Sequence, residues 1–161
     1  MREDITIVRA SVDDAEEVLG VIRRAFGPVA EQYGDPELPP LVETLDSHRK
    51  RYETSVVLKA LDADGRIVGT VQGESRDDGC CYVARLAVDP ARQGTGIGRT
   101  LTEALEAEFQ EASRFELFTG HKSEGSLGLY RSLGYRETRR ECVNDDLTLV
   151  WMEKVRRQRR T

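Results

Sequence analysis

The stretch LAVDPARQGTGIGRTL, residues Leu86–Leu101, places four kinds of local structure in direct succession. An apolar run is stopped by Asp89-Pro90, three glycines follow at alternate positions, and a helical pattern then begins. Glycine permits positive φ and lets a ligand approach the backbone closely. The first N–H groups of a helix have no partner inside the helix and carry partial positive charge. The stretch therefore predicts a backbone cradle for a phosphate-like group.

Two familiar phosphate cradles fit this turn poorly. The dinucleotide fingerprint G-x-G-x-x-G fails because Arg99 stands where the last glycine is required after Gly94-Thr95-Gly96. The P-loop fails because Gln93 stands at its leading glycine and Arg99 replaces its lysine. The remaining pattern is Gln-x-x-Gly-x-Gly over Gln93–Gly98. The alternative is a tight loop without a ligand, although three glycines at a helix start cost backbone entropy.

Apolar periodicity and turn residues divide the rest of the chain into strands and helices. Gly27-Pro28 is predicted to end the first helix, and Pro28–Pro40, with four prolines, is predicted to be a loop. Gly134 stands where a helix end favours a left-handed residue. The predicted strands are Ile5–Arg9, Ser55–Asp62, Arg66–Glu74, Cys80–Val88, Phe115–Thr119, Tyr135–Cys142 and Leu147–Val155. The predicted helices are Ala15–Phe26, Leu41–Tyr52, Gly96–Phe109 and Ser123–Leu133.

This order of elements predicts an α+β fold, a mixed α/β layer. We expect a central mixed sheet of about seven strands with one parallel strand–helix–strand crossover, flanked by about four helices. The crossover runs from Leu86–Val88 through the glycine turn to Phe115–Thr119. No linker or repeat divides the chain, so a single domain over residues 1–161 is predicted, with 156–161 as a frayed tail.

Composition excludes several classes of protein. The chain has 161 residues, a net charge of −5 and three cysteines, of which Cys80 and Cys81 are adjacent. With two histidines and no Cys-x-x-Cys spacing, no metal site is expected. The charged start and the lack of a long apolar run predict a cytoplasmic protein with reduced thiols and no membrane contact. The net charge argues against nucleic acid, although Val155–Thr161 holds four arginines.

Two motifs together resemble a known family. RLAVDPARQGTGIGRTL, ending at Leu101, resembles the acyl-CoA-binding motif of the GNAT superfamily of N-acetyltransferases. SLGLYRSLGYRE, from Ser126, is similar to the helix-and-turn signature of that superfamily. The resemblance implies a GNAT-like fold, acetyl-CoA as co-substrate, direct transfer of the acetyl group to an amine in a ternary complex, and homodimerisation.

The resemblance also implies roles for individual residues. A main-chain N–H in Leu86–Val88 would polarise the acetyl carbonyl, and the Tyr130 hydroxyl would protonate the departing thiolate. Alternatively, Tyr130 simply packs on the inner helix face. Ser123 replaces the asparagine common in the family, and capping of its helix is the alternative to a pantetheine contact. The implied cofactor-binding residues are Leu86, Ala87, Val88, Gln93, Gly94, Thr95, Gly96, Ile97, Gly98, Arg99, Ser123, Ser126 and Tyr130.

A general base is the least determined part of the site. The strand Cys80–Val88 contains no carboxylate, which leaves His121, Glu74 and Tyr82 as candidates. His121 follows a predicted parallel strand, and the ordinary pKa of histidine suits a base. Deprotonation relayed by water is the alternative.

The acceptor amine is not identified by the sequence. Its pocket is expected between the helix Ala15–Phe26, the loop Gly27–Pro40 and the hairpin near Asn144. Carboxylates in the loop would favour a cationic acceptor, unless the loop is merely solvated. The carboxylates are those of Glu31, Asp35 and Glu37, and Tyr33 stands among them. Two other functions stay open: a non-catalytic acyl-CoA sensor, and a module that binds a partner through its arginine tail.

Overall fold

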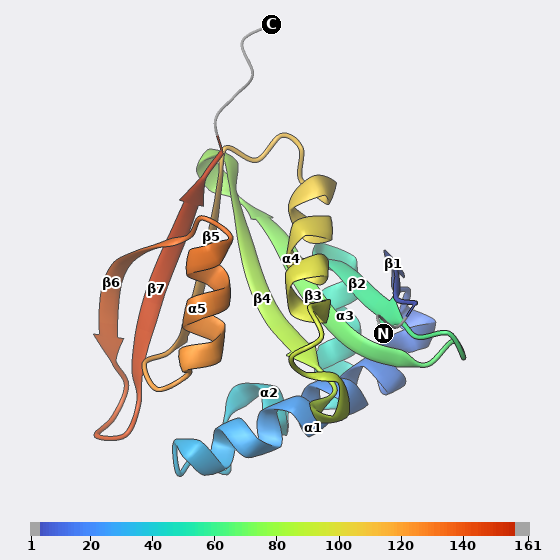
Figure 1. Cartoon of the computed structure of the whole chain (residues 1–161), viewed down its shortest axis with the longest axis horizontal. Coiled ribbons are helices and arrows are strands. Elements are labelled where there is room, and N and C mark those ends of the chain that lie inside the picture. Colours follow the sequence, from blue (N-terminus) through green and yellow to red (C-terminus); the bar gives the residue numbers. More distant parts are fainter. Residues whose placement is uncertain (1–3, 157–161) are drawn as a thin grey trace, which may run out of the picture.

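A mixed sheet with the strand order β1-β2-β3-β4-β5-β7-β6 forms the centre of the structure, a computed structural model that describes residues 4–156 (Figure 1). All neighbouring strands are antiparallel except β4 and β5, which are parallel. The α+β fold and the single parallel crossover are therefore confirmed. The strands are β1 (Thr6–Arg9), β2 (Val56–Leu61), β3 (Ile67–Arg76), β4 (Cys80–Val88), β5 (Arg114–Gly120), β6 (Arg136–Cys142) and β7 (Thr148–Val155).

Five α-helices and three short 3-10 turns connect these strands within the described range. The helices are α1 (Ala15–Gln32), α2 (Pro39–Val42), α3 (Leu45–Thr54), α4 (Ile97–Glu108) and α5 (Glu124–Ser132). The turns are η1 (Val12–Asp14), η2 (Asp77–Gly79) and η3 (Pro90–Arg92). Most boundaries lie within two residues of the sequence-based expectation, and β4 agrees at both ends.

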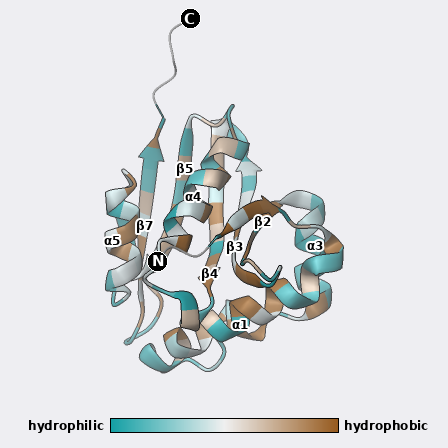
Figure 2. Cartoon of the chain, turned by 45° about the vertical axis from the view of Figure 1, so that its right-hand side comes forward, coloured by the Kyte–Doolittle hydropathy of each residue, from teal (hydrophilic) through white to brown (hydrophobic). Residues whose placement is uncertain are grey.

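The helices pack on both faces of the sheet and enclose two hydrophobic clusters. On one face, Leu101 and Leu105 of α4 are fully buried. A Cβ at Gly73 would lie 2.7 Å from Phe109, so glycine is needed where α4 crosses β3. On the other face, Val18 and Ile22 of α1 pack against the sheet. Figure 2 shows the matching hydrophobic colouring along β2.

The first helix is longer than predicted. Proline removes one helical hydrogen bond and costs about 3 kcal/mol in a helix interior, yet α1 continues through Pro28 to Gln32. The helical turn after Pro28 is stabilised because it places Ala30 and Tyr33 in the interior. These two residues are 5% and 2% exposed. Packing therefore outweighs the local signal. The prediction that Gly27-Pro28 ends the helix is wrong, as is the loop over Pro28–Gln32.

The next predicted helix is in fact two helices. Pro39 and Pro40 form the first turn of α2, a position that proline tolerates because its missing N–H would have no partner there. The chain then extends at Glu43 and restarts at Thr44, whose Oγ1 accepts a hydrogen bond from the Ser47 N–H at 3.1 Å. This N-cap sets the start of α3 at Leu45.

The C-terminal hairpin forms around Asn144 as predicted. Its Oδ1 accepts hydrogen bonds from the N–H groups of Asp146 and Leu147. The second strand of the hairpin, β7, pairs with β5 along its length. In the sheet, β7 therefore lies between β5 and β6, and β6 forms the outer edge. Gly134 adopts φ +99°, as its place after α5 requires.

The expectation of a frayed tail from residue 156 is wrong for its first residue. The Arg156 guanidinium donates hydrogen bonds to the carbonyls of Phe109 and Glu106, and it lies 4.8 Å from the Phe115 ring centroid. These contacts tie the end of β7 to the end of α4. The remaining tail residues, 157–161, lie outside the described residues.

Truncating Leu105 tests the packing of α4 on the sheet. Leu105→Ala removes a side chain with no exposed surface, so the free energy of unfolding should fall by about 2–5 kcal/mol through lost burial and a residual cavity. Urea unfolding measures this change. The exposed Glu103→Ala on the same helix is the control and should stay within about 0.5 kcal/mol of the wild type. Equal stability of the two variants would contradict this packing.

Candidate functional site

The two parallel strands separate soon after they meet. Cys80, Cys81 and Tyr82 pair with Arg114, Phe115 and Glu116, and no further β4–β5 pairs follow in the part of the chain that the structure describes. Figure 1 shows the strands close together at one end and far apart near α1. The carboxyl ends of β4 and β5 therefore open a gap, the position where open α/β sheets bind ligands.

A bulge in β4 lies at this gap. Gln72 pairs with Ala84 and Thr70 with Ala87, so Arg85 and Leu86 together oppose Val71. Arg85 adopts φ +56°, a left-handed conformation rare for a non-glycine residue. A bulge bends its strand and redirects the adjacent backbone and side chains. Beyond Tyr82, the edge of β4 that faces β5 thus has backbone groups without a partner strand.

The glycine turn leads directly into α4. Gly94 and Gly96 have φ of +81° and +89°, so these two positions require glycine for backbone reasons. Gly98 has a different constraint: a Cβ there would lie 3.4 Å from Leu129 of α5. Among residues 4–156, no acceptor is present for the N–H groups of Gly96 to Arg99. The turn therefore presents several free donors at the positive end of a helix.

These donors and the strand gap share one cleft of about 640 Å³. Ten of the thirteen residues expected to bind a cofactor line it: Leu86, Ala87, Val88, Gln93, Gly94, Gly96, Ile97, Gly98, Ser123 and Ser126. Thr95, Arg99 and Tyr130 do not line it. The Thr95 Oγ1 donates to the Arg92 carbonyl at 2.6 Å, and the Arg99 guanidinium donates to Ser132 on α5. Helix α1 supplies the opposite wall of the cleft through Ala25, Phe26, Val29 and Gln32.

Ser123 precedes α5, but its side chain caps no helical N–H. Its Oγ lies 2.9 Å from the hydroxyl of Tyr33, which also accepts a hydrogen bond from the Lys122 N–H at 2.8 Å. A Cβ at Gly120 would overlap the Tyr33 ring. The buried Tyr33 thus braces the end of α1 against the loop after β5. The capping alternative for Ser123 is wrong, and Tyr33 offers no surface to a cationic acceptor.

Tyr130 is buried on the inner face of α5, and its ring contacts that of Tyr135 with centroids 5.7 Å apart. Burial raises the pKa of Tyr130 well above its ordinary value, so its hydroxyl stays protonated. That hydroxyl has no hydrogen-bond partner among the described residues. Ser126 stands one helical turn earlier on the same face and does line the cleft.

The His121 side chain is held by β7. Its Nδ1 accepts a hydrogen bond from the Thr148 N–H at 2.9 Å, so the ring proton is assigned to Nε2. His121 also lies against Tyr33, with ring centroids 5.9 Å apart. The lone pair that a base needs is therefore already engaged, and His121 does not line the cleft. This arrangement does not favour the role expected from the sequence.

Glu74 lies on β3 opposite Tyr82, at the end where β4 and β5 are still paired. The bulge is three residues further along β4, a separation of about 10 Å at ~3.3 Å per residue. Tyr82 is half-buried beneath the Arg76 guanidinium, which lies 4.2 Å from its ring centroid. Burial raises the pKa of Tyr82. Neither candidate base is adjacent to the bulge.

The acidic segment after α1 is only partly exposed to a ligand. Glu31 and Glu37 are exposed, whereas Asp35 accepts a hydrogen bond from the Glu37 N–H at 3.0 Å and shapes the turn. These carboxylates therefore fit the alternative of a solvated acidic loop.

A charged cluster beside the bulge was missed by sequence reasoning. The Glu43 carboxylate accepts three hydrogen bonds of 2.6–2.9 Å from Arg51 and lies 3.5 Å from Arg85 Nη2. His48 Nδ1 also lies 3.5 Å from Glu43, and its Nε2 lies 3.0 Å from the Tyr52 hydroxyl. Glu43 and His48 are almost wholly buried. Arg85 is distant in sequence from the other members of the cluster, and no local spacing links it to Glu43.

Burial governs the protonation of this cluster. It disfavours the ionised form of Glu43, but the hydrogen bonds and charge of Arg51 outweigh it, so the pKa of Glu43 falls below its usual range. Burial lowers the pKa of His48, against the opposing charge of Glu43. At neutral pH His48 is therefore neutral, and the cluster combines one carboxylate with two guanidiniums.

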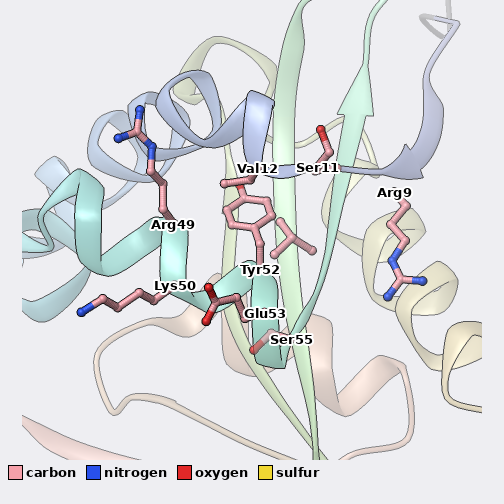
Figure 3. Close-up of a pocket in the computed structure, with 10 residues that line it drawn as sticks. Arg9, Ser11, Val12, Arg49, Lys50, Tyr52, Glu53 and Ser55 are labelled. Carbon is pink, nitrogen blue, oxygen red and sulfur yellow. The ribbon is translucent and has the colours of Figure 1, made fainter.

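A second hollow of about 480 Å³ lies between α3 and β1 (Figure 3). Its cationic side chains, Arg9, Arg49 and Lys50, point away from one another, so they do not converge on a ligand. The Tyr52 ring fills the middle of the hollow beside Val12. We therefore assign the site to the cleft at the glycine turn.

Neither a metal-binding cluster nor a membrane-spanning helix is found within residues 4–156. No group of three His, Cys, Asp or Glu side chains is arranged to hold a metal ion there. No helix in that range has the length and apolarity to span a bilayer. The thiols of Cys80, Cys81 and Cys142 are free.

Comparison with known proteins gives one consistent family. A family model described as an acetyltransferase (GNAT) domain matches residues 31–156. The chain is 33% identical over 95 residues to "Probable N-acetyltransferase 14" of Danio rerio, which covers 56% of this chain and 34% of that protein. A UPF0039 protein of Schizosaccharomyces pombe is 29% identical over 92 residues, with 56% and 61% covered. The chain thus spans about a third and three-fifths of these two relatives.

Solved structures share the fold at low sequence identity. The ribosomal-protein-S18-alanine N-acetyltransferase of Escherichia coli has a TM-score of 0.77 at 18% identity, with 94% of each chain covered. The PaiA N-acetyltransferase of Thermoplasma acidophilum, in complex with coenzyme A, has a TM-score of 0.75 at 17% identity, with 95% and 99% covered. The structure of a "putative acyl-CoA N-acyltransferase" of Klebsiella pneumoniae has a TM-score of 0.70 at 26% identity, with 94% and 97% covered.

The buried imidazole of His48 should make stability depend on pH. In the unfolded chain His48 binds a proton near pH ~6.5. In the native state burial lowers the pKa of His48, so protonation requires a lower pH. Stability should therefore fall as pH decreases below ~6.5, by up to about 1.4 kcal/mol per pH unit for this group. Urea unfolding between pH 5 and 8 should show a flatter profile for His48→Gln. Tyr52→Phe, which keeps the imidazole, should retain the wild-type slope; identical slopes for wild type and His48→Gln would refute this account.

Proposed function

This chain belongs to the GNAT acetyltransferase family, and on that premise we propose that it transfers an acetyl group from acetyl-CoA to the amine of a small molecule or peptide. The amine attacks the thioester directly while both substrates are bound. The family supports acetyl transfer in general, and a neighbour of the same fold is a complex with coenzyme A. Acetyl-CoA as the donor and direct attack are the specific parts of this proposal.

One observation carries the proposal: the free N–H groups of the glycine turn and the gap between β4 and β5 line the same cleft. The turn can hold the diphosphate of the coenzyme by its amide hydrogens and the dipole of α4. Leu86, Ala87 and Val88 lie along the cleft from the turn to the bulge. The pantetheine arm would follow this strand edge toward the gap.

The bulge supplies the electrophilic part of the mechanism. The β4 edge beyond Tyr82 has no partner strand, so a main-chain N–H in Leu86–Val88 can donate to the thioester carbonyl. Such a fixed donor stabilises the oxyanion as the amine attacks, without reorganisation during the reaction.

Tyr130 is the proposed acid for the leaving thiolate. It stands one turn beyond Ser126, which lines the cleft, and its hydroxyl is protonated and unpaired within the described chain. A coenzyme that enters between β4 and α5 would bring its sulfur toward this hydroxyl. The proton passes from Tyr130 to the thiolate as the carbon–sulfur bond breaks.

Deprotonation of the acceptor is assigned to water. His121 has its lone pair engaged, and Glu74 lies about 10 Å from the bulge by strand length. A water chain from the gap toward Glu74 can carry the proton of the ammonium group. The lack of an adjacent base in residues 4–156 favours a second candidate, a non-catalytic acyl-CoA sensor on the same fold.

Calorimetry and thiol release separate these functions. The full chain should bind acetyl-CoA and CoA, and it should release CoA thiol with at least one class among amino acids, polyamines, aminoglycosides and peptide N-termini. Tight acetyl-CoA binding without turnover on any amine would favour the sensor. Failure to bind either coenzyme would refute both functions.

A negative charge in the glycine turn should weaken coenzyme binding. Thr95→Glu places a carboxylate beside the proposed diphosphate position and should raise the Kd for acetyl-CoA at least about tenfold by charge repulsion. Thr138→Glu on β6 is the matched control, because both threonines are exposed and donate to a backbone carbonyl. Calorimetry measures both. Equal Kd values for the two variants would place the diphosphate elsewhere.

Removing the Tyr130 hydroxyl should slow the chemical step. Tyr130→Phe should lower kcat about 100-fold or more, the typical contribution of a general acid. Its stability and its Kd for acetyl-CoA should hardly change, because the hydroxyl has no partner in the described chain. Steady-state kinetics with a good acceptor provides the measurement. Full turnover of this variant at every pH would show that Tyr130 has a packing role and is not the acid.

A further inference from the structure

The Arg85 guanidinium is held beside the gap but is not fully paired. Glu43, its nearest carboxylate, already accepts three short hydrogen bonds from Arg51, and its contact with Arg85 is longer, at 3.5 Å. The Nε of Arg85 is buried and has no acceptor among residues 4–156. The Arg85 side chain is 15% exposed, so it still reaches the surface.

Within this ion-paired cluster positive charge exceeds negative charge, and Glu74 of β3 acts on Arg51 only as a more distant charge. One carboxylate faces two guanidiniums, and His48 is neutral because burial lowers its pKa. A desolvated charge without its own counter-ion is unfavourable. A carboxylate on a ligand would restore the balance and match the planar donor fork of arginine.

Gln72 is a second polar residue without a partner, and it lies on the sheet face covered by α1, because its cross-strand neighbour Val57 packs in the cluster with that helix. Gln72 pairs with Ala84, the residue before Arg85, and its side chain is 2% exposed. Both its Oε1 and its Nε2 lack a hydrogen-bond partner within the described residues. Buried amides are rarely left unpaired, so a polar group from outside the polypeptide is expected nearby.

The position of Arg85 suits the acceptor. Arg85 does not line the cleft itself, but it directly precedes Leu86, which does, and it is a bulge residue three positions beyond the last β4–β5 pair, near the place proposed for the thioester. By strand register, Phe118 of β5 stands level with Ala84, two residues beyond the last β4–β5 pair. The Phe118 ring lies 6.3 Å from that of Tyr82 and 4.9 Å from that of Trp151, and Phe118 is 40% exposed. An apolar surface thus adjoins the guanidinium.

We propose that Arg85 binds the carboxylate of the acceptor, which is therefore an amino acid with an apolar or aromatic side chain rather than a polyamine. This inference rests on the proposed function and names its acceptor class. The aromatic rings of Phe118 and Tyr82 provide the surface for the side chain. Glu43 and Arg51 orient Arg85, and Glu43 offers little to a cationic acceptor because Arg51 already neutralises it.

Matched acceptors test the carboxylate directly in the wild-type protein. Thiol release is measured with L-phenylalanine, L-phenylalaninamide and spermidine, and kcat/KM should be about 10- to 100-fold higher for the acid than for the amide. The amino group of the amide is the less basic, so easier deprotonation cannot explain a preference for the acid. A higher kcat/KM for the amide or for spermidine would overturn the proposal.

Substitutions then assign the effect to Arg85. Arg85→Gln should remove the preference for the acid, and Arg85→Lys should restore part of it through its charge. Arg49→Gln is the matched control, because Arg49 is an exposed arginine of α3 that pairs with Asp46 at 3.7 Å and takes no part in the proposed acceptor site. Thermal unfolding and acetyl-CoA binding confirm that each variant is folded. A preference that survives in both Arg85 variants would overturn the assignment.

A binding measurement separates this inference from the proposed function. Calorimetry of CoA-saturated wild type with L-phenylalanine and L-phenylalaninamide requires no turnover. Selective binding of the acid without thiol release would refute acetyl transfer and support the carboxylate site. Thiol release from amines without any selectivity for the acid would support acetyl transfer and refute the carboxylate site.

Discussion

The separation of β4 from β5 is the constraint on which the site depends. Three residue pairs hold the strands together near Cys80, and the bulge at Arg85 then bends β4 away. Parallel pairing along the full length would place backbone partners where the cleft now lies. Because the strands part, the glycine turn, the β4 edge and α5 can line one cleft. Helix α1 closes the other side, and its continuation through Pro28 brings Tyr33 to the loop after β5.

The same bulge determines which charged groups meet on the sheet face covered by α3. Positive φ at Arg85 inserts an additional residue on the face covered by α3, where its guanidinium meets Glu43. The ion cluster links the start of α3 to the middle of β4 and positions a charge beside the gap. Buried ionic groups contribute little net stability unless every charge is paired. The incomplete pairing of Arg85 is therefore a weak source of stability.

Local signals predicted the elements and the glycine turn well. Positive φ at Gly94, Gly96 and Gly134 follows from conformational preferences of single residues, and β4 agrees at both ends with its apolar run. Local signals failed where distant packing opposed them. Pro28 lies inside a helix because Ala30 and Tyr33 are buried beyond it. Ser123 bonds the hydroxyl of Tyr33, 90 residues away, and makes no capping bond to α5.

The sequence by itself determined the α+β fold, the parallel crossover and the identity of the turn that faces the cleft, because each depends on residues adjacent in the chain. Only the tertiary structure decided which side chains meet at the gap. The contact of Glu43 with Arg85, the engagement of His121 by Thr148 and the insertion of β7 beside β5 join residues from separate elements. Their formation depends on strand register and helix packing, which no local pattern of residues encodes.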